Sequence, residues 1–312
     1  MIMNVNKRIL ISGGTGFQGS HLVEYFLGCG YEVTALNTFS ERSEKNISYL
    51  KKKPKIVWGS VTDSETVNKT VREHDIVLHL ASHINVDESI LDPSTTLRAN
   101  IEGTYNVLEA VRKQKNRLIY ASTCEVYGAP VGKKLIDETA ELRPHSPYAA
   151  SKAAADRLCF SYFKTYGLNI SVIRPFNVFG PRQREAEFGA LIAISVKRAL
   201  DGKSLKISGQ GQQTRDYMYI DDVVQAYDLM VSLENTAGEV YNFGTGVETS
   251  IKEIVEYIAG KFGVGVEYLE ARPGEVNNFC ADITKVKKLG FQPKVNIWEG
   301  IDRYILWRKN QK

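Results

Sequence analysis

The sequence predicts an α/β fold, a doubly wound parallel sheet with a smaller C-terminal substrate-binding lobe interwoven with it. Through the first 175 residues, apolar segments of strand length alternate with amphipathic segments of helix length, which is the pattern of consecutive βαβ units. The first apolar segment runs into a turn that contains Gly13, Gly16 and Gly19, and then into an amphipathic segment. A strand, a glycine turn and a helix in this order predict a Rossmann-type sheet that binds a diphosphate.

Each of the six strands expected in this sheet is a short apolar run that ends at polar or glycine residues. The fourth is apolar enough to be buried on both faces, and its His79 is expected to be a structural core residue. The serine–proline pair Ser146-Pro147 predicts the start of a long helix. The expected strands are Arg8–Ser12, Tyr31–Leu36, Ile56–Trp58, Asp75–Ala81, Arg117–Ser122 and Asn169–Arg174; expected helices include 19–28, 95–113 and 148–166.

The glycine turn has the spacing G-x-x-G-x-x-G rather than G-x-G-x-x-G. Gly13 allows the tight turn, Gly16 lets the backbone approach the phosphates, and Gly19 lets the helix pack closely on the strand. This spacing resembles that of the short-chain dehydrogenases/reductases, and Thr15-Gly-Phe-Gln-Gly19 resembles their extended subgroup. The resemblance implies that Phe17 and Gln18 also contact the dinucleotide.

The bulk composition is that of a globular protein with a substantial core. The chain has 312 residues, of which 43% are apolar and 24% charged, and a net charge of +4. The charge is spread along the chain, so we expect no nucleic-acid partner. The sequence shows neither a signal peptide nor an apolar run long enough to span a bilayer, which favours a cytoplasmic protein that does not bind membranes. The four cysteines form no C-x-x-C pair, so we expect free thiols and no metal site.

The end of the second strand bears on the choice of cofactor. In NAD-binding folds an acidic residue at this strand tip binds the adenosine ribose, but here the position is Asn37. Asparagine can still hydrogen-bond a ribose, and it would not repel a 2′-phosphate as a carboxylate does. NAD is therefore the first expectation, and NADP stays open.

A tyrosine and a lysine, Tyr148 and Lys152, stand four residues apart near the start of the long helix, which places them on one helix face. A lysine ammonium beside a tyrosine lowers the pKa of the phenol, so that the tyrosinate can take a proton from a hydroxyl. The same spacing recurs at Tyr49/Lys53 and Tyr257/Lys261. Only Tyr148 follows a strand that ends in Ser-Thr downstream of a dinucleotide turn, so this context selects it.

Taken together, these motifs resemble an extended short-chain dehydrogenase/reductase of the nucleotide-sugar epimerase/dehydratase family over nearly all of the chain. The resemblance implies that Thr123 hydrogen-bonds the reacting hydroxyl, that Tyr148 is the base, and that Lys152 tunes it and binds the nicotinamide ribose. It implies further cofactor contacts at Ser60, Val61, Leu80, Ala81, Ser82 and Asn100. It implies that a nucleotide-diphosphate sugar is bound by Ser89, Asn177, Arg215 and Arg272.

The reaction that follows oxidation at C4 depends on Thr123-Cys124-Glu125. The 4,6-dehydratases of this family carry Thr-Asp-Glu or Thr-Ser-Glu here. Glu125 fits the base that removes the C5 proton, whereas Cys124 replaces the acid. The first expectation is a 4,6-dehydratase; a 4-epimerase, then a uronate decarboxylase, and, from a different class, a non-catalytic cofactor-binding relative remain alternatives.

The domain organisation follows from a change of pattern after Pro175, where the βαβ alternation becomes interrupted. We expect a dinucleotide-binding domain over 1–175, to which 212–235 returns, and mainly a nucleotide-sugar-binding lobe over 176–312. The family resemblance also implies a homodimer in which the helices near 95–113 and 148–166 form a four-helix bundle.

Overall fold

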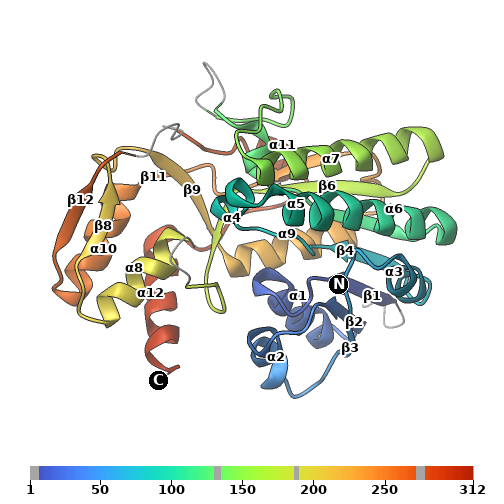
Figure 1. The fold of residues 1–312 in the computed structure, drawn as a ribbon, viewed down its shortest axis with the longest axis horizontal. Coiled ribbons are helices and arrows are strands. Elements are labelled where there is room, and N and C mark those ends of the chain that lie inside the picture. Colours follow the sequence, from blue (N-terminus) through green and yellow to red (C-terminus); the bar gives the residue numbers. More distant parts are fainter. Residues whose placement is uncertain (1–6, 130–134, 186–189, 272–277, 312) are drawn as a thin grey trace. The chain divides into compact units, whose positions relative to one another are not determined.

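The computed structural model describes residues 7–129, 135–185, 190–271 and 278–311 (Figure 1). The chain forms two compact units. The first comprises residues up to Val126 together with Pro144–Arg174 and Val224–Tyr241, and the second comprises Tyr127–Arg143, Pro175–Val223 and the chain from Asn242 onward. Both units are therefore assembled from segments that are distant in the sequence.

The first unit is built on a sheet with the strand order β10-β6-β5-β4-β1-β2-β3. The pairs from β6 to β3 are parallel. The strand order reverses between β1 and β4, which is where open α/β sheets bind their ligands, beyond the carboxyl ends of the strands. The predicted fold class is confirmed. The strands are β1 (Arg8–Ser12), β2 (Glu32–Asn37), β3 (Lys55–Trp58), β4 (Ile76–His79), β5 (Arg117–Ala121), β6 (Ile170–Pro175) and β10 (Val240–Phe243).

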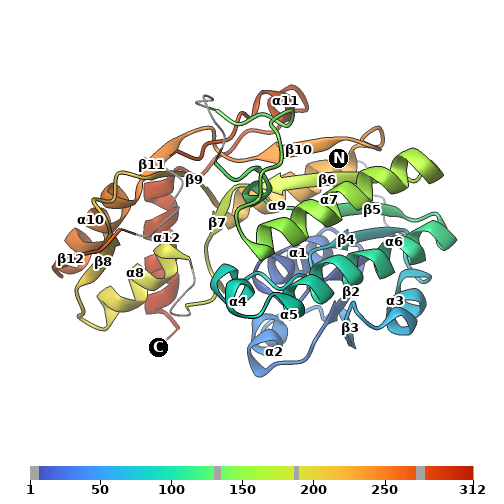
Figure 2. The ribbon, with the colours of Figure 1, turned by 45° about the horizontal axis from the view of Figure 1, so that its top comes forward.

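Helices cover both faces of this sheet, as Figure 2 shows. On one face α3 (Ser64–Val71), α6 (Gly103–Gln114) and α7 (Pro147–Tyr166) bury apolar side chains against the strands. On the other face, α1 (Phe17–Gly28) packs on β1 and β2 and contacts α2 (Glu41–Ser48). Burial of these apolar faces is the main force that holds the layers together.

The long helix α7 begins where the sequence predicts. The Ser146 side chain accepts the Ala149 N–H at 3.1 Å, and Pro147 occupies the first turn. The helix ends at Gly167, whose φ of +63° suits glycine. The predicted helix over 95–113 is instead divided into α5 (Pro93–Leu97), a π-helical turn (Arg98–Glu102) and α6. Before them, α4 (Val86–Leu91) follows β4.

The second unit contains a three-stranded sheet in the order β11-β9-β7, and β12 pairs in parallel with β8. Asp216 of β9 is fully buried, and it accepts hydrogen bonds from backbone N–H groups of Thr245, Gly246 and Ala281 at 2.8, 2.9 and 3.3 Å. This carboxylate ties the loop after β10 to β9. The strands are β7 (Asn177–Phe179), β8 (Leu205–Ser208), β9 (Thr214–Tyr219), β11 (Glu248–Ser250) and β12 (Val266–Leu269).

The other helices are α8 (Leu191–Leu200), α9 (Ile220–Ser232), α10 (Ile251–Phe262), α11 (Thr284–Lys288) and α12 (Ile297–Lys309). The end of α9 is fixed by Arg117 of β5, whose guanidinium donates to the carbonyls of Met230, Val231 and Leu233. In the described part of the chain, none of the helices has the length and apolar character required to cross a bilayer.

Candidate active site at the carboxyl ends of the strands

The glycine turn lies between β1 and α1 and brings backbone segments into close approach. Gly13 has a φ of +74°, a conformation that a side chain would strain. A Cβ atom on Gly19 would lie 2.1 Å from the Gly13 carbonyl oxygen. The Gly13 N–H donates to the Leu36 carbonyl at 2.8 Å, which joins the turn to the end of β2. The roles predicted for these glycines in the turn and in close packing agree with this geometry.

The start of α1 suits an anionic ligand. Its N-cap is Gly16, which has no capping side chain, and its first turn carries no acidic residue. The first N–H groups of a helix lack partners within the helix, and they form its positive end. Asn46 of α2 holds the preceding backbone by donating to the Thr15 carbonyl at 2.9 Å. The hydroxyl of Thr15 is buried and has no hydrogen-bond partner, so this turn fits the diphosphate of a dinucleotide.

The predicted adenosine-side residues lie at the ends of β2 and β3. Asn37 pairs in register with Trp58, and its side-chain amide donates to the Thr38 carbonyl at 2.8 Å. Ser60 accepts the Thr62 N–H at 3.1 Å. Val61 is buried, with its side chain beneath Gly103, where an added Cβ would lie 2.6 Å from Val61 Cγ2. Among these residues, Asn37 and Ser60 are the more accessible for hydrogen bonds to a ligand.

The loop after β4 runs beside the glycine turn, at the reversal of strand order. The Leu80 N–H donates to the Ser12 carbonyl at 3.0 Å, and the Ala81 N–H to the Ser12 hydroxyl at 3.2 Å. A Cβ on Gly13 would lie 2.9 Å from the Ala81 nitrogen. The structure therefore brings together the predicted cofactor residues Gly13, Leu80 and Ala81.

Asn100 lies in the π-helical turn, and its side-chain amide forms its hydrogen bonds with other residues of the protein. Its side-chain oxygen accepts from the Ser82 hydroxyl at 2.9 Å and from the His83 N–H at 2.7 Å. Its amide nitrogen donates to the His83 carbonyl at 3.1 Å and to the Ser151 hydroxyl at 2.8 Å. An asparagine side chain offers two donors and two acceptor positions, so none is left for the predicted bond near the cofactor. Asn100 instead ties the loop after β4 to α7.

Ser89 also differs from its predicted role. Its side chain is fully buried, so in this conformation it cannot touch a sugar. Its hydroxyl donates to the Val86 carbonyl at 2.6 Å and accepts the Tyr148 N–H at 3.1 Å. Ser151, which the sequence analysis missed, donates its hydroxyl to the Tyr148 carbonyl at 2.6 Å. Two serines thus hold the backbone of Tyr148 on both sides.

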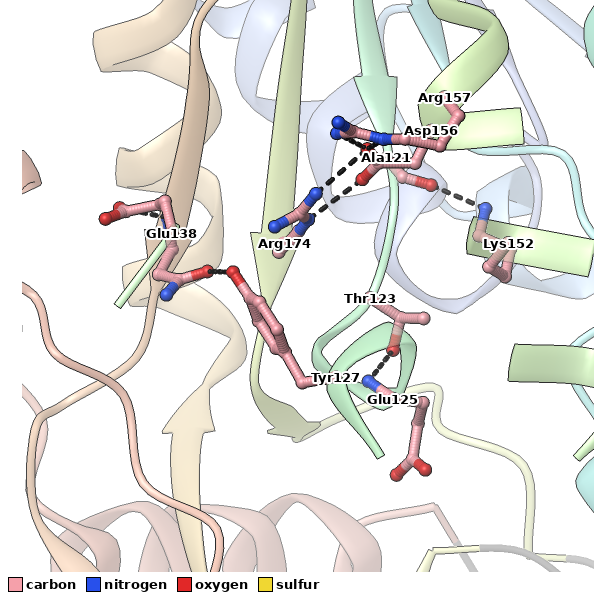
Figure 3. Close-up of polar contacts among 10 residues, drawn as sticks. Ala121, Thr123, Glu125, Tyr127, Glu138, Lys152, Asp156, Arg157 and Arg174 are labelled. Atoms are coloured by element: carbon pink, nitrogen blue, oxygen red, sulfur yellow. Dashed lines mark hydrogen bonds and ion pairs between the residues drawn. The ribbon is translucent and has the colours of Figure 1, made fainter. Parts of the chain in front are cut away.

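Tyr148, Thr123 and Glu125 lie together. Burial raises the pKa of the Tyr148 phenol, and the charge of Glu125 raises it further, whereas a hydrogen bond with the Thr123 side chain acts in the opposite direction. The Thr123 hydroxyl also accepts the Glu125 N–H at 3.3 Å (Figure 3). Cys124 is buried, whereas Glu125 is half-buried.

Lys152 is buried and its ammonium is engaged with β5. It donates to the Ala121 carbonyl at 2.6 Å (Figure 3) and lies 4.5 Å from the centre of the Tyr120 ring. Burial lowers its pKa to about 7. The Tyr148 pKa is raised overall, and its lowering by a charged Lys152 stays a prediction. The Lys152 ammonium donates to the Ala121 carbonyl, and the pKa of the Tyr148 phenol is set mainly by burial and by the charge of Glu125.

His79 is a structural core residue, as predicted. It is fully buried, with Nδ1 2.6 Å from the Ser12 hydroxyl and Nε2 3.1 Å from that of Thr104. Burial lowers its pKa to about 3, so the ring is neutral at pH 7. It fixes β4 to β1 and α6.

The residues predicted to bind substrate from the C-terminal part belong to the second unit. Asn177 opens β7, and its side-chain oxygen is buried without a hydrogen-bond partner. Arg215 of β9 donates to the Thr214 carbonyl at 2.8 Å. Arg272 lies outside the described residues. A buried acceptor such as that of Asn177 is suited to a donor on a ligand.

Comparison with known proteins identifies the family. A sequence model described as GDP-mannose 4,6 dehydratase matches residues 10–304. The chain belongs to the nucleotide-sugar epimerase/dehydratase family of extended short-chain dehydrogenases/reductases. The family resemblance expected from the glycine turn and the Tyr148–Lys152 pair is thereby confirmed.

Family members similar to this chain catalyse different reactions. A putative UDP-glucose 4-epimerase of Methanocaldococcus jannaschii is 34% identical over 97% of this chain and 98% of its own length. A UDP-N-acetyl-alpha-D-glucosaminuronate decarboxylase of Bacillus cytotoxicus is 32% identical, over 97% of this chain and 98% of its own length. The structure of the dTDP-glucose 4,6-dehydratase DesIV from Streptomyces venezuelae, with NAD and TYD bound, matches with a TM-score of 0.90. It is 30% identical, and 97% of each chain is covered.

Proposed function

We propose that this chain is an NAD-dependent enzyme that oxidises a nucleotide sugar at C4, and that it is a 4,6-dehydratase. The observation that carries the proposal is the grouping of Thr123, Glu125 and Tyr148, in which the Glu125 charge acts on the Tyr148 phenol. A hydroxyl, a phenol and a carboxylate in one place are the groups needed to remove first a hydroxyl proton and then a carbon-bound proton.

The dinucleotide would lie along the glycine turn, with its diphosphate at the start of α1 and Phe17 and Gln18 in the first helical turn. Asn37 and Ser60 would hydrogen-bond the adenosine part, and Ala81 and Ser82 would line the path toward Tyr148. NAD supplies the site that takes a hydride from C4 and later returns it to the sugar. Because Asn37 carries no negative charge, it would not repel the 2′-phosphate of NADP.

The first proton transfer requires Tyr148 to become a phenolate. Burial and Glu125 favour the protonated phenol, so the transfer depends on the groups that favour the charged form. These are the Thr123 hydroxyl and, when it is protonated, Lys152 one turn further along α7. Thr123 would also orient the C4 hydroxyl toward Tyr148.

Glu125 would carry out the second proton transfer. Oxidation at C4 would make the C5 proton acidic; the Glu125 carboxylate would take that proton and, in its acid form, give it to the C6 hydroxyl, which leaves as water. The half-buried position of Glu125 suits a carboxylate that must be both ionised and accessible to a sugar.

The second candidate is a 4-epimerase, and Cys124 favours it. Cys124 replaces the acidic or hydroxyl residue of the related dehydratases, and it is buried. A buried thiol is a weak proton donor, so it is a poor source of the proton that the C6 hydroxyl needs. Epimerisation at C4 needs only Thr123, Tyr148 and Lys152.

Substrate binding and assembly are part of the proposal. Asn177, through its side-chain amide N–H, and Arg215 would donate hydrogen bonds to the diphosphate, the arginine through two parallel bonds. The exposed Tyr105 of α6 and Phe160 of α7 are 48% and 39% accessible, and such apolar side chains on two helices support the expected four-helix homodimer interface.

The products decide between these reactions. The purified chain is incubated with NAD and UDP-, GDP-, dTDP- or CDP-hexoses, and the products are weighed by mass spectrometry. A dehydratase yields a product lighter by one water, whereas an epimerase yields an isomer of unchanged mass. Loss of carbon dioxide from a nucleotide uronate would instead identify a decarboxylase, and no product from any sugar would contradict the proposal.

A further inference from the structure

A buried ion pair lies one helical turn beyond Lys152. Asp156 of α7 and Arg174 of β6 are both almost completely buried, and Arg174 Nε and Nη2 donate to the two carboxylate oxygens of Asp156 at 2.8 and 2.9 Å. Arg157 also contacts this carboxylate, and Figure 3 shows both guanidinium groups directed at it. Burying such charges is costly, so the pair calls for a reason beyond packing α7 on β6.

The helix geometry relates this pair to the candidate active site. Lys152 and Asp156 are four residues apart, so their side chains emerge on the same face of α7. Lys152 is buried; burial lowers its pKa to about 7, while Cys159 and then Asp156 act in the opposite direction. The ionised or neutral state of Lys152 thus depends on its neighbours.

Among the titratable neighbours of Lys152, Asp156 is the anion. Burial keeps the other side chains near it neutral at pH 7; these are His79 of β4, Tyr120 of β5, and Tyr148 and Cys159 of α7. Burial opposes ionisation of Asp156 too, but the hydrogen bonds and charges of Arg174 and Arg157 lower the pKa of this carboxyl. The two arginines together therefore keep Asp156 charged, and Asp156 favours the charged form of Lys152.

We propose that Asp156, held by Arg174, is a positioning residue for the Tyr148–Lys152 pair, because its carboxylate keeps Lys152 in the ammonium form. This inference rests on the proposed function for its catalytic meaning, since an ammonium, unlike an amine, stabilises the phenolate of Tyr148. It also makes the paired charges of Asp156 and Arg174 a part of the active site that does not touch the substrate.

Two variants of the same ion pair separate this role from a merely structural one. Asp156→Asn removes the anion, and Arg174→Gln removes one of its two cations but leaves a carboxylate that Arg157 still contacts and keeps charged. Both break the pair, so a structural role predicts the same effect from each. The electrostatic role predicts that Asp156→Asn lowers the titration midpoint of Lys152 by about one pH unit, and that Arg174→Gln does not lower it.

The midpoint is measured on the full chain by NMR, from the shift of lysine labelled with ¹³C at Cε against pH. The Lys152 signal is assigned by its loss in Lys152→Met. Asp156→Glu keeps the charge, and its Lys152 midpoint is expected to stay near that of the wild type. If Asp156→Asn does not fold, the single variants Asp156→Glu and Arg174→Gln are compared with the wild type instead. Equal shifts in the same direction for both pair variants, or no shift in Asp156→Asn, would overturn the proposal. If Asp156→Asn cannot be measured, a lowered Lys152 midpoint in either Asp156→Glu or Arg174→Gln would overturn the proposal.

This titration does not depend on which sugar is converted. If the chain proves inactive on every nucleotide sugar, the proposed function fails but the midpoints still test the link between Asp156 and Lys152. In an active enzyme, the same Asp156→Asn substitution shifts the alkaline limb of the kcat profile to lower pH, because Lys152 loses its proton earlier.

Discussion

The Ser89 hydroxyl accepts the backbone N–H of Tyr148 at 3.1 Å, across 59 residues of sequence. Tyr148 is the second residue of α7, and an N–H at that position has no acceptor within its own helix. Ser146 satisfies the next N–H, that of Ala149. The start of the helix that carries the candidate base is thus capped by one local and one distant serine.

Replacement of this distant serine tests its role. Ser89→Ala leaves the Tyr148 N–H buried without an acceptor, and we expect a loss of about 1–3 kcal/mol in the free energy of unfolding. Because Tyr148 is then less well placed, kcat should fall more than KM rises. Urea unfolding and steady-state kinetics measure the two effects. The control is Ser48→Ala, because the exposed Ser48 hydroxyl donates to the nearby Lys45 carbonyl. An equal loss of unfolding free energy and of kcat in both variants would refute the role of Ser89.

Removal of the Tyr148 hydroxyl tests the candidate base. Tyr148→Phe should lower kcat by about 10²–10⁴-fold, the usual contribution of a general base, while NAD binding measured by calorimetry stays close to that of the wild type. The matched control is Tyr257→Phe, since Tyr257 has the same spacing to Lys261 but contacts Asp302 in the second unit. Full activity of Tyr148→Phe would indicate a different base or a non-catalytic protein.

Acid should destabilise the fold partly through His79. Its pKa falls from 6.5 to about 3 in the folded protein because of burial, so between these values the unfolded chain binds more protons. The stability that the neutral ring contributes is therefore present above pH 6.5 and is lost progressively as the pH falls toward 3. We expect the unfolding free energy to depend less steeply on pH in His79→Gln than in the wild type when urea unfolding is compared at pH 7, 6 and 5. Identical slopes would show that His79 does not titrate in this way.

The proposed substrate role of Arg215 gives a kinetic prediction. Arg215→Ala should raise KM for the nucleotide sugar by about tenfold or more, since a charged hydrogen bond contributes about 1.5–3 kcal/mol, and should leave the dissociation constant of NAD unchanged. Arg198→Ala is the control, because this half-buried arginine of α8 donates to the Ser204 carbonyl. A similar weakening of sugar and NAD binding by Arg215→Ala would exclude a specific contact with the sugar nucleotide.

The sequence predicts the parts of the site that depend on local pattern. The glycine turn, the end of β2 at Asn37 and the start of α7 at Ser146 follow from short motifs, because strand, turn and cap preferences act over a few residues. The doubly wound parallel sheet follows once the βαβ alternation is recognised.

The remaining features depend on contacts between distant segments. Neither the bond from Ser89 to Tyr148 nor the four bonds of Asn100 has a local sequence signal, and the π-helical turn at Arg98–Glu102 interrupts a segment that reads as one helix. The direction of Lys152 toward Ala121 likewise depends on how α7 packs on β5. Helix spacing places Lys152 and Tyr148 on one face but does not determine which group the ammonium binds.

The most direct test of the proposed reaction is solvent deuterium incorporation by the wild type and by Glu125→Gln. In deuterated water, we predict that the wild type gives a product lighter by one water that carries deuterium at C5, and that Glu125→Gln forms this product much more slowly while still binding NAD. An isomer of unchanged mass without deuterium from the wild type would contradict dehydration, and would identify a 4-epimerase in which Glu125 only lines the pocket.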